Sequence, residues 1–167
     1  MRRALFAAVA LLLAGGTMAA EALKPLHTNG EVLPNSCTRA GQAALRGKLA
    51  APKAAVVKAE EAWRLVHTLL CAPGTAQARA YLRSHMGKTV EQLVQATGSE
   101  DETSIVAVDD ELVNSLQQEG RAWEAEIDAY SEDVTVHSWS DEASMRSRTL
   151  RFEGGTWRIV ATMDASD

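Results

Sequence analysis

The hydrophobic pattern changes its period part-way along the 167-residue chain, and this change constrains the fold more than any other feature of the sequence. Before Gly120, apolar residues recur every three or four positions, which predicts amphipathic helices. After Gly120 they alternate with polar residues, which predicts strands. Helices followed by consecutive strands are typical of an α+β fold. The clearest helical stripe consists of Val56, Ala59, Trp63, Val66 and Leu70.

Capping signals divide the first part of the chain into further elements. A short helix is predicted to end at Pro52, and Thr75 can cap a helix that ends before Gly87. Thr89 and Gln92 fit a capping box, which predicts another helix ending before Gly98. Branched residues over 104–108 favour a strand, and Asp109 can cap a helix that ends at Gly120.

The second part predicts an antiparallel meander over residues 123–128, 134–139, 145–152 and 156–163. Gly154 and Gly155 permit a two-residue turn, which pairs Phe152 with Trp157, Leu150 with Ile159 and Arg148 with Ala161. The same rule across the loop 129–132 pairs Ile127 with Val134, Ala125 with Val136 and Glu124 with His137. One sheet face is then apolar, and we expect the helices to cover it. Trp63, Trp123 and Trp157 are assigned to the core.

The N-terminal residues predict export. Arg2 and Arg3 precede an apolar run over 4–14 and small residues over 15–20, as in a cleaved signal peptide. A membrane anchor would need about 20 apolar residues, and the run over 4–14 has only eleven, so the segment is too short to span a membrane. We therefore expect a periplasmic protein with a signal peptide over 1–20, an irregular arm over 21–36 and a single domain over 37–167. In that oxidising compartment Cys37 and Cys71, the only two cysteines, predict one disulfide.

The end of the meander supports a family resemblance. Helices, a strand, a helix and then a meander ending in Phe-Glu-Gly-Gly-Thr-Trp-Arg-Ile, residues 152–159, resemble the small secreted proteins of the NTF2-like (cystatin-like cone) superfamily. The resemblance covers roughly residues 53–163. It implies a bent sheet wrapped around a helix, in a superfamily that includes enzymes, ligand binders and non-catalytic domains.

Three residues are candidates for ligand binding in such a cone. Alternation places Arg146 and Arg148 on the apolar face, toward the open end of the sheet with Ser138. At a cavity mouth the guanidinium groups could hold a carboxylate or a phosphate. The alternative is that the sheet twists beyond its helices and both arginines reach water.

Acidic residues suggest a protein partner. Without residues 1–20 the chain has 15 basic and 22 acidic side chains, a net charge of −7. This balance argues against nucleic-acid binding and could steer the protein onto a basic partner. Glu124, Glu126 and Asp128 on one strand, together with Trp139, are the candidate partner-binding residues, the alternative being a solvated sheet face.

These observations leave three hypotheses for the function. The first is an exported, non-catalytic binding or inhibitory protein, analogous to immunity proteins that neutralise toxins directed at the cell wall. The second is an NTF2-like domain that binds a small anionic ligand through Arg146 and Arg148. The third is an enzyme in which Glu124 and His137 act as a general base, although the pair could equally be solvated. No metal or cofactor motif is found, so we expect neither a metal nor a cofactor.

Overall fold

The computed structural model describes residues 33–34, 36–94, 102–117, 122, 124–140 and 144–166. The expected signal peptide, Trp123 and the predicted helix ends at Gly98 and Gly120 lie outside these residues. The described helices are α1 (Arg39–Leu49), α2 (Ala59–Leu70), α3 (Ala76–Ser84) and α4 (Asp110–Ser115). The strands are β1 (Leu33–Pro34), β2 (Met86–Val94), β3 (Glu102–Ala107), β4 (Glu124–Tyr130), β5 (Asp133–Trp139), β6 (Ser144–Glu153) and β7 (Thr156–Ser166).

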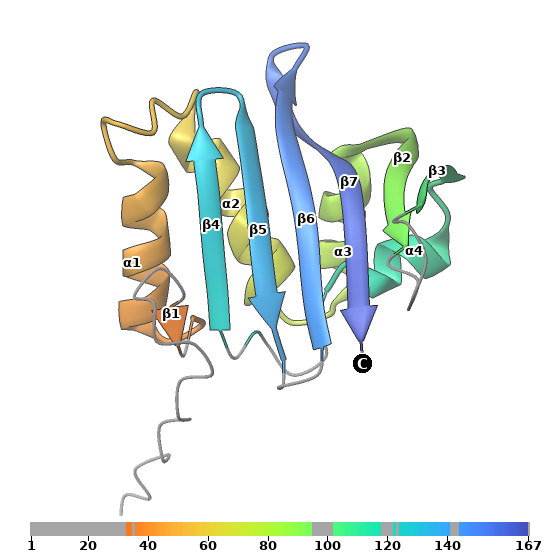
Figure 1. The fold of residues 1–167 in the computed structure, drawn as a ribbon, viewed down its shortest axis with the longest axis horizontal. Coiled ribbons are helices and arrows are strands. Elements are labelled where there is room, and N and C mark those ends of the chain that lie inside the picture. Colours follow the sequence, from red (N-terminus) through yellow and green to blue (C-terminus); the bar gives the residue numbers. More distant parts are fainter. Residues whose placement is uncertain are drawn as a thin grey trace, which may run out of the picture.

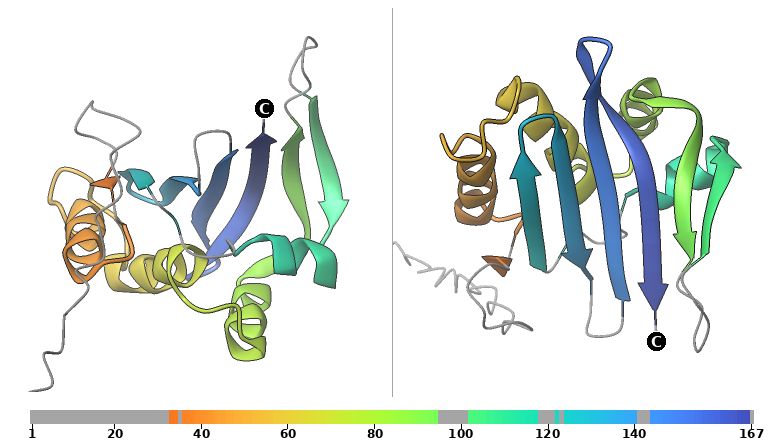
Figure 2. Two further views of the ribbon diagram at one scale, coloured as in Figure 1. Left: turned by 90° about the horizontal axis from the view of Figure 1, so that it is seen from below. Right: turned by 45° about the horizontal axis from the view of Figure 1, so that its top comes forward.

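The strands form one sheet in the order β1-β4-β5-β6-β7-β2-β3 (Figure 1). β4 to β7 form the predicted antiparallel meander, while β2 pairs with β7 in parallel and with β3 in antiparallel orientation. The described helices all lie on one side of the sheet (Figure 2). The chain is therefore an α+β protein with a helical layer on one sheet face, as the sequence predicted.

The other sheet face has no helix over it in the described part of the chain, and we call it the outer face (Figure 2). Register and alternation assign its residues, because directly paired side chains point to the same face. On its central rows lie Glu126, Asp128, Thr135, His137, Trp139, Met145, Ser147, Thr149, Ala161, Met163, Ala165, Glu91, Leu93, Thr103 and Ile105.

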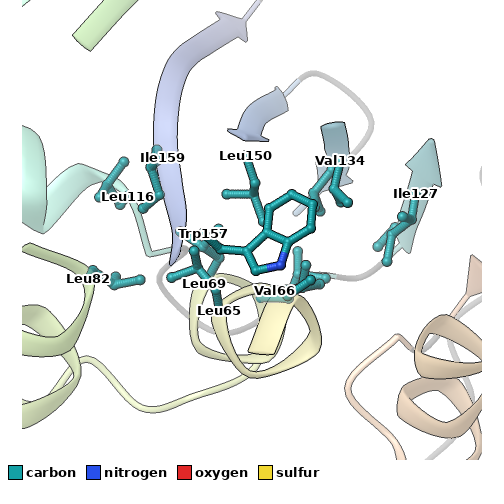
Figure 3. Close-up of a cluster of buried hydrophobic side chains, with 14 of the residues drawn as sticks. Leu65, Val66, Leu69, Leu82, Leu116, Ile127, Val134, Leu150, Trp157 and Ile159 are labelled. Carbon is teal, nitrogen blue, oxygen red and sulfur yellow. The ribbon is translucent and has the colours of Figure 1, made fainter. Parts of the chain in front are cut away.

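The core lies between the covered face and α2. Trp157 of β7 is buried with Leu150 of β6 and Val66 of α2 (Figure 3), and its indole Nε1 donates to the Val57 carbonyl at 2.9 Å. Burying such apolar side chains contributes about 1.5–3 kcal/mol each. Trp157 is thus a core residue as predicted, whereas Trp63 is only partly buried at the edge of the same cluster.

Two of the predicted helix caps are confirmed. The Thr75 hydroxyl accepts from the Ala78 amide at 3.1 Å at the start of α3, and the Asp109 carboxylate accepts from the Leu112 amide at 2.8 Å at the start of α4. Each cap satisfies an amide that has no partner within the helix.

The helix predicted to begin at Thr89 is wrong, because this segment is strand β2. Val90 is buried on the covered face, and β2 has a neighbouring strand on each side, β7 and β3. The ladder bonds on both sides and the burial of branched residues outweigh a local capping signal. Thr89 and Gln92 therefore pair with β3 instead of capping a helix.

Turn lengths explain which strand registers were predicted correctly. Gly154 and Gly155 have φ of 59° and 86°, and Phe152 pairs with Trp157 and Leu150 with Ile159 as expected. A bulge then shifts the ladder, so Arg148 pairs with Thr162 and not with Ala161.

The register between β4 and β5 differs from the prediction by two residues. Ile127 pairs with Val136, Ala125 with Ser138 and Glu126 with His137. The turn between the strands is shorter than the loop we expected, because Ser131 adopts a φ of 53°. A shift of two leaves every side chain on its predicted face.

The predicted disulfide is confirmed. Cys37, just before α1, is bonded to Cys71 at the end of α2, with their Cα atoms 5.3 Å apart. The bond joins the start of the first described helix to the end of the second, within the layer that covers the sheet.

Candidate functional site

Arg146 and Arg148 lie on the covered face of β6 and hold the C-terminal end of α4. Arg146 Nη1 donates to the carbonyl oxygens of Ser115 and Gln117 at 3.4 and 3.2 Å, and Arg148 Nη2 donates to Ser115 at 3.3 Å. The last carbonyls of a helix have no intrahelical partner, so cationic donors there are favourable. An anion at this point would have to compete with α4 for the same donors.

Arg148 also forms a buried ion pair. Its Nη1 lies 2.5 Å from Asp164 Oδ1 on β7 and donates to the Met163 carbonyl at 2.8 Å. The Arg148 side chain is 4% exposed and that of Asp164 45%. Burial lowers the pKa of Arg148 from its ordinary value, and the Asp164 carboxylate opposes this shift. Thr162 of β7 is paired with Arg148 in the sheet. Neither Arg148 Nε nor Thr162 Oγ1 has a hydrogen-bond partner among the described residues.

A cavity of about 360 Å³ lies between α4 and the adjoining strands. Asp109, Glu111 and Asp164 line it, so its electrostatics favour a cation over the anion that we expected here. None of the three predicted ligand-binding residues lines this cavity: Arg146 and Arg148 bond to its surroundings, and Ser138 is buried on β5 at the position paired with Arg146. Within the described residues, no group of three or more His, Cys, Asp or Glu side chains could hold a metal ion.

The acidic residues of β4 do not all reach solvent as predicted. Glu126 and Asp128 lie on the outer face, and Asp128 is exposed. Glu124 is fully buried, so the expectation that it lies on the surface is wrong. Its pairing with Trp139 of β5 places it on the outer face with Glu126 and Asp128, so alternation alone does not account for its burial.

The outer face combines apolar and acidic side chains. At one end of this face, Trp139, Met145 and Ala165 form an apolar row across three neighbouring strands. Met163 and Leu93 lie beside this row, paired with each other on β7 and β2. Among the described residues, the two large hydrophobic side chains that are most exposed, Ile105 at 66% and Tyr130 at 72%, also belong to the strands of this face. Ile105 on β3 and Tyr130 on β4 lie toward opposite edges of the sheet, whereas the residues of the apolar row and those beside it adjoin one another and are partly exposed. A contiguous apolar patch on a surface indicates an interaction site.

Acidic side chains border this apolar region. Glu126 and Asp128 lie on β4 and Glu91 lies on β2, and none of the three pairs with a lysine or arginine among the described residues. Asp133 and Glu153 add two carboxylates, but they share Arg151, at 2.9 and 3.8 Å. The outer face therefore has an excess of negative charge.

His137 has a different carboxylate neighbour from the one expected. The corrected register removes it from Glu124 and pairs it with Glu126, while its Nε2 lies 3.7 Å from Asp128 Oδ2. Both partners are on the outer face, where the solvent reaches Asp128. The predicted general base formed by Glu124 and His137 is not assembled.

Comparison with known proteins gives one structural likeness. No protein-family model matches the sequence, and no curated protein matches it. Among solved structures, an NTF-2 like protein of unknown function from Silicibacter pomeroyi DSS-3 is similar with a TM-score of 0.44 and 16% sequence identity. The match covers 65% of this chain and 94% of that chain. It is a weak NTF2-like resemblance.

Sequence reasoning missed two features of the site. Arg146 and Arg148 contact the end of α4, a six-residue helix. The spacing of residues along β6 does not predict where that helix ends in space. The apolar part of the outer face was signalled by Met163 and Leu93. Leu93 was assigned to a helix, so its alignment with Met163 across two strands was not recognised.

Proposed function

We propose that this chain is an exported binding protein that captures a basic protein partner on its outer sheet face. The proposal rests on one observation, namely that the helical layer covers only one face of the sheet in the described chain (Figure 2). Within the described chain, side chains of this face that reach solvent, such as Asp128 and Ile105, can contact another molecule.

The chemistry of that face favours a protein partner. Trp139, Met145 and Met163 provide apolar contact area, and aromatic residues and methionine are enriched at protein interfaces. Glu126, Asp128 and Glu91 lie around this area and have no lysine or arginine partner within the residues that the structure describes, so a basic surface would supply counter-charges. Such complementarity raises association rates more than it raises affinity.

A more specific role follows the first hypothesis from the sequence. An exported inhibitor of a toxin directed at the cell wall would have this form, a small disulfide-bonded domain with an acidic binding face. The small anionic ligand of the second hypothesis has less support, since the donors of Arg146 and Arg148 bond to protein oxygens.

The experiment is a differential capture. The domain starting at residue 21 is immobilised as wild type and as the double variant Glu126→Lys/Asp128→Lys, and both are exposed to periplasmic extract at 20 and 300 mM salt. The matched control, Glu60→Lys/Glu111→Lys, makes the same charge change in the helical layer. We expect a basic protein that the wild type and the control retain at 20 mM salt and that the double variant recovers at least tenfold less.

Salt provides an independent readout. Exposed charges are screened over about 8 Å at 0.15 M ionic strength, so recovery by the wild type should fall at 300 mM. If the β4 variant and the helical control retain the same proteins in equal amounts, or if recovery does not change with salt, the outer face is not the binding surface. Thermal unfolding of each variant checks that the fold is kept.

A further inference from the structure

Within the described chain, the edge of β4 has no strand beside it over most of its length. β1 pairs only with Glu124 and Ala125, and no other strand of the described chain lies along Glu126–Tyr130. In an edge strand, alternate backbone N–H and C=O groups point away from the sheet and can accept another strand. β1 shows that this edge takes a strand in antiparallel orientation.

A groove runs beside this open edge. It has a volume of about 660 Å³ and lies between α1 and Glu126–Ala129. On the α1 side it is lined by the small residues Ala44, Gly47 and Ala51 and by Lys48 and Lys53. A Cβ built on Gly47 would meet no atom within 4 Å. Small side chains on the helix therefore leave space for a chain in extended conformation between α1 and the sheet.

Both ends of the groove are closed. β1 occupies the edge next to Ala125, and beyond Tyr130 the segment 54–57 binds the turn, with the Ser131 amide donating to Ala54 at 2.8 Å and the Val57 amide donating to Ser131 at 3.0 Å. The free edge between these contacts is five residues long. At about 3.4 Å per residue it accommodates a strand of four to five residues.

The side chains along the edge define the chemistry of an added strand. Residues opposite Glu126 and Asp128 would lie on the outer face next to two carboxylates. Residues opposite Ile127 and Ala129 would enter the groove beside α1, where Lys48 and Lys53 disfavour a further positive charge and small uncharged side chains fit. We infer that the β4 edge binds an extended segment of a basic protein, with lysine or arginine alternating with small apolar residues. The inference builds on the proposed function and names the part of the partner that is recognised.

The probe is the peptide acetyl-Gly-Lys-Val-Lys-Ala-Lys-Gly-amide, titrated into the isotopically labelled domain. We expect amide shifts centred on Glu126–Tyr130, and affinity that falls about twofold to fivefold for each of Glu126→Gln and Asp128→Asn, as for exposed ion pairs. Glu111→Gln is the matched control, because it removes an exposed carboxylate of α4, in the helical layer on the other side of the sheet, and should leave affinity unchanged.

Two N-methylated peptides test strand addition itself. One carries methyl groups on the amides of every odd residue and the other on those of every even residue. Only one set of amides faces β4 in a strand pairing, so one peptide should lose binding and the other should retain it. If both bind alike, no ladder is formed and the inference is wrong, even if the capture experiment succeeds. If the capture experiment fails and only one peptide binds, the edge is a site but the proposed partner is not.

The remaining outcomes concern other occupants of the edge. If the amides of Glu126–Tyr130 exchange slowly without peptide and become fast when residues before 33 are deleted, this chain occupies its own edge. If their protection rises with protein concentration, a second copy does. Either result overturns the inference.

Discussion

Replacing Arg148 by methionine tests whether the predicted ligand-binding arginine holds the fold together. The variant keeps an unbranched side chain of similar length and removes the ion pair with Asp164 and the bonds to the Ser115 and Met163 carbonyls. We expect Arg148→Met to lower the stability of the domain markedly, because the Asp164 carboxylate and three backbone carbonyls, those of Ser115, Ser147 and Met163, lose a charged donor together.

The magnitude follows from the burial of the partners. Breaking a buried ion pair by removing one member costs about 3–5 kcal/mol. The Asp164 side chain is 45% exposed and can recover water, and methionine removes the cost of burying a guanidinium, so the loss should be about 2–3 kcal/mol. For a domain of this size that is a fall in Tm of roughly 10 °C.

Urea unfolding followed by circular dichroism, with the disulfide intact, measures the difference. Arg151→Met is the matched control, since Arg151 lies three positions further along β6 and forms an exposed pair with Asp133 at 2.9 Å. Removing it should cost less than about 1 kcal/mol. If Arg148→Met lies within about 0.5 kcal/mol of the wild type, the reasoning is refuted, and the guanidinium would be free to serve a ligand.

Two further predictions concern the disulfide and the last turn. Cys37→Ala/Cys71→Ala removes the disulfide that closes a loop of about 35 residues, and it should lower the free energy of unfolding in urea by roughly 3.8 kcal/mol. Thiol labelling of the denatured, unreduced wild type should find no free cysteine. Two reactive thiols per chain would contradict this. Gly154→Val/Gly155→Val should lower stability by about 2–4 kcal/mol, because both positions have positive φ, whereas Gly154→Asn should be nearly neutral. An unchanged melting temperature in the double valine variant would contradict the role of the turn.

The sequence predicted the features that depend on neighbouring residues. Thr75 and Asp109 cap helices because their side chains reach amides three residues away, and Gly154 with Gly155 sets the last hairpin because the two strands are contiguous. The covered face was also predicted, since alternation decides which side chains of a strand share a face.

The features that depend on distant partners could not be predicted in this way. β2 is a strand because β7, some seventy residues later, supplies a ladder beside it. The burial of Glu124 is a second case, since its alternation with Ala125 and Ile127 predicts a side chain that faces away from the core. To predict that Arg146 and Arg148 contact α4, one must know where the end of α4 lies relative to β6, and this is known only once the sheet is assembled.

The central position of β7 has a consequence for the order in which the fold forms. The last strand of the chain lies between β6 and β2, so it bonds to neighbours on both sides. The hairpin of β2 and β3 cannot join the meander until residues 156–166 have been synthesised. Pairing β2 with β7 requires the chain between them to close a long loop before any contact forms, and this entropic cost slows folding. The sheet is therefore completed only after β7 has been made, and until then the edge of β2 that β7 occupies has no strand beside it.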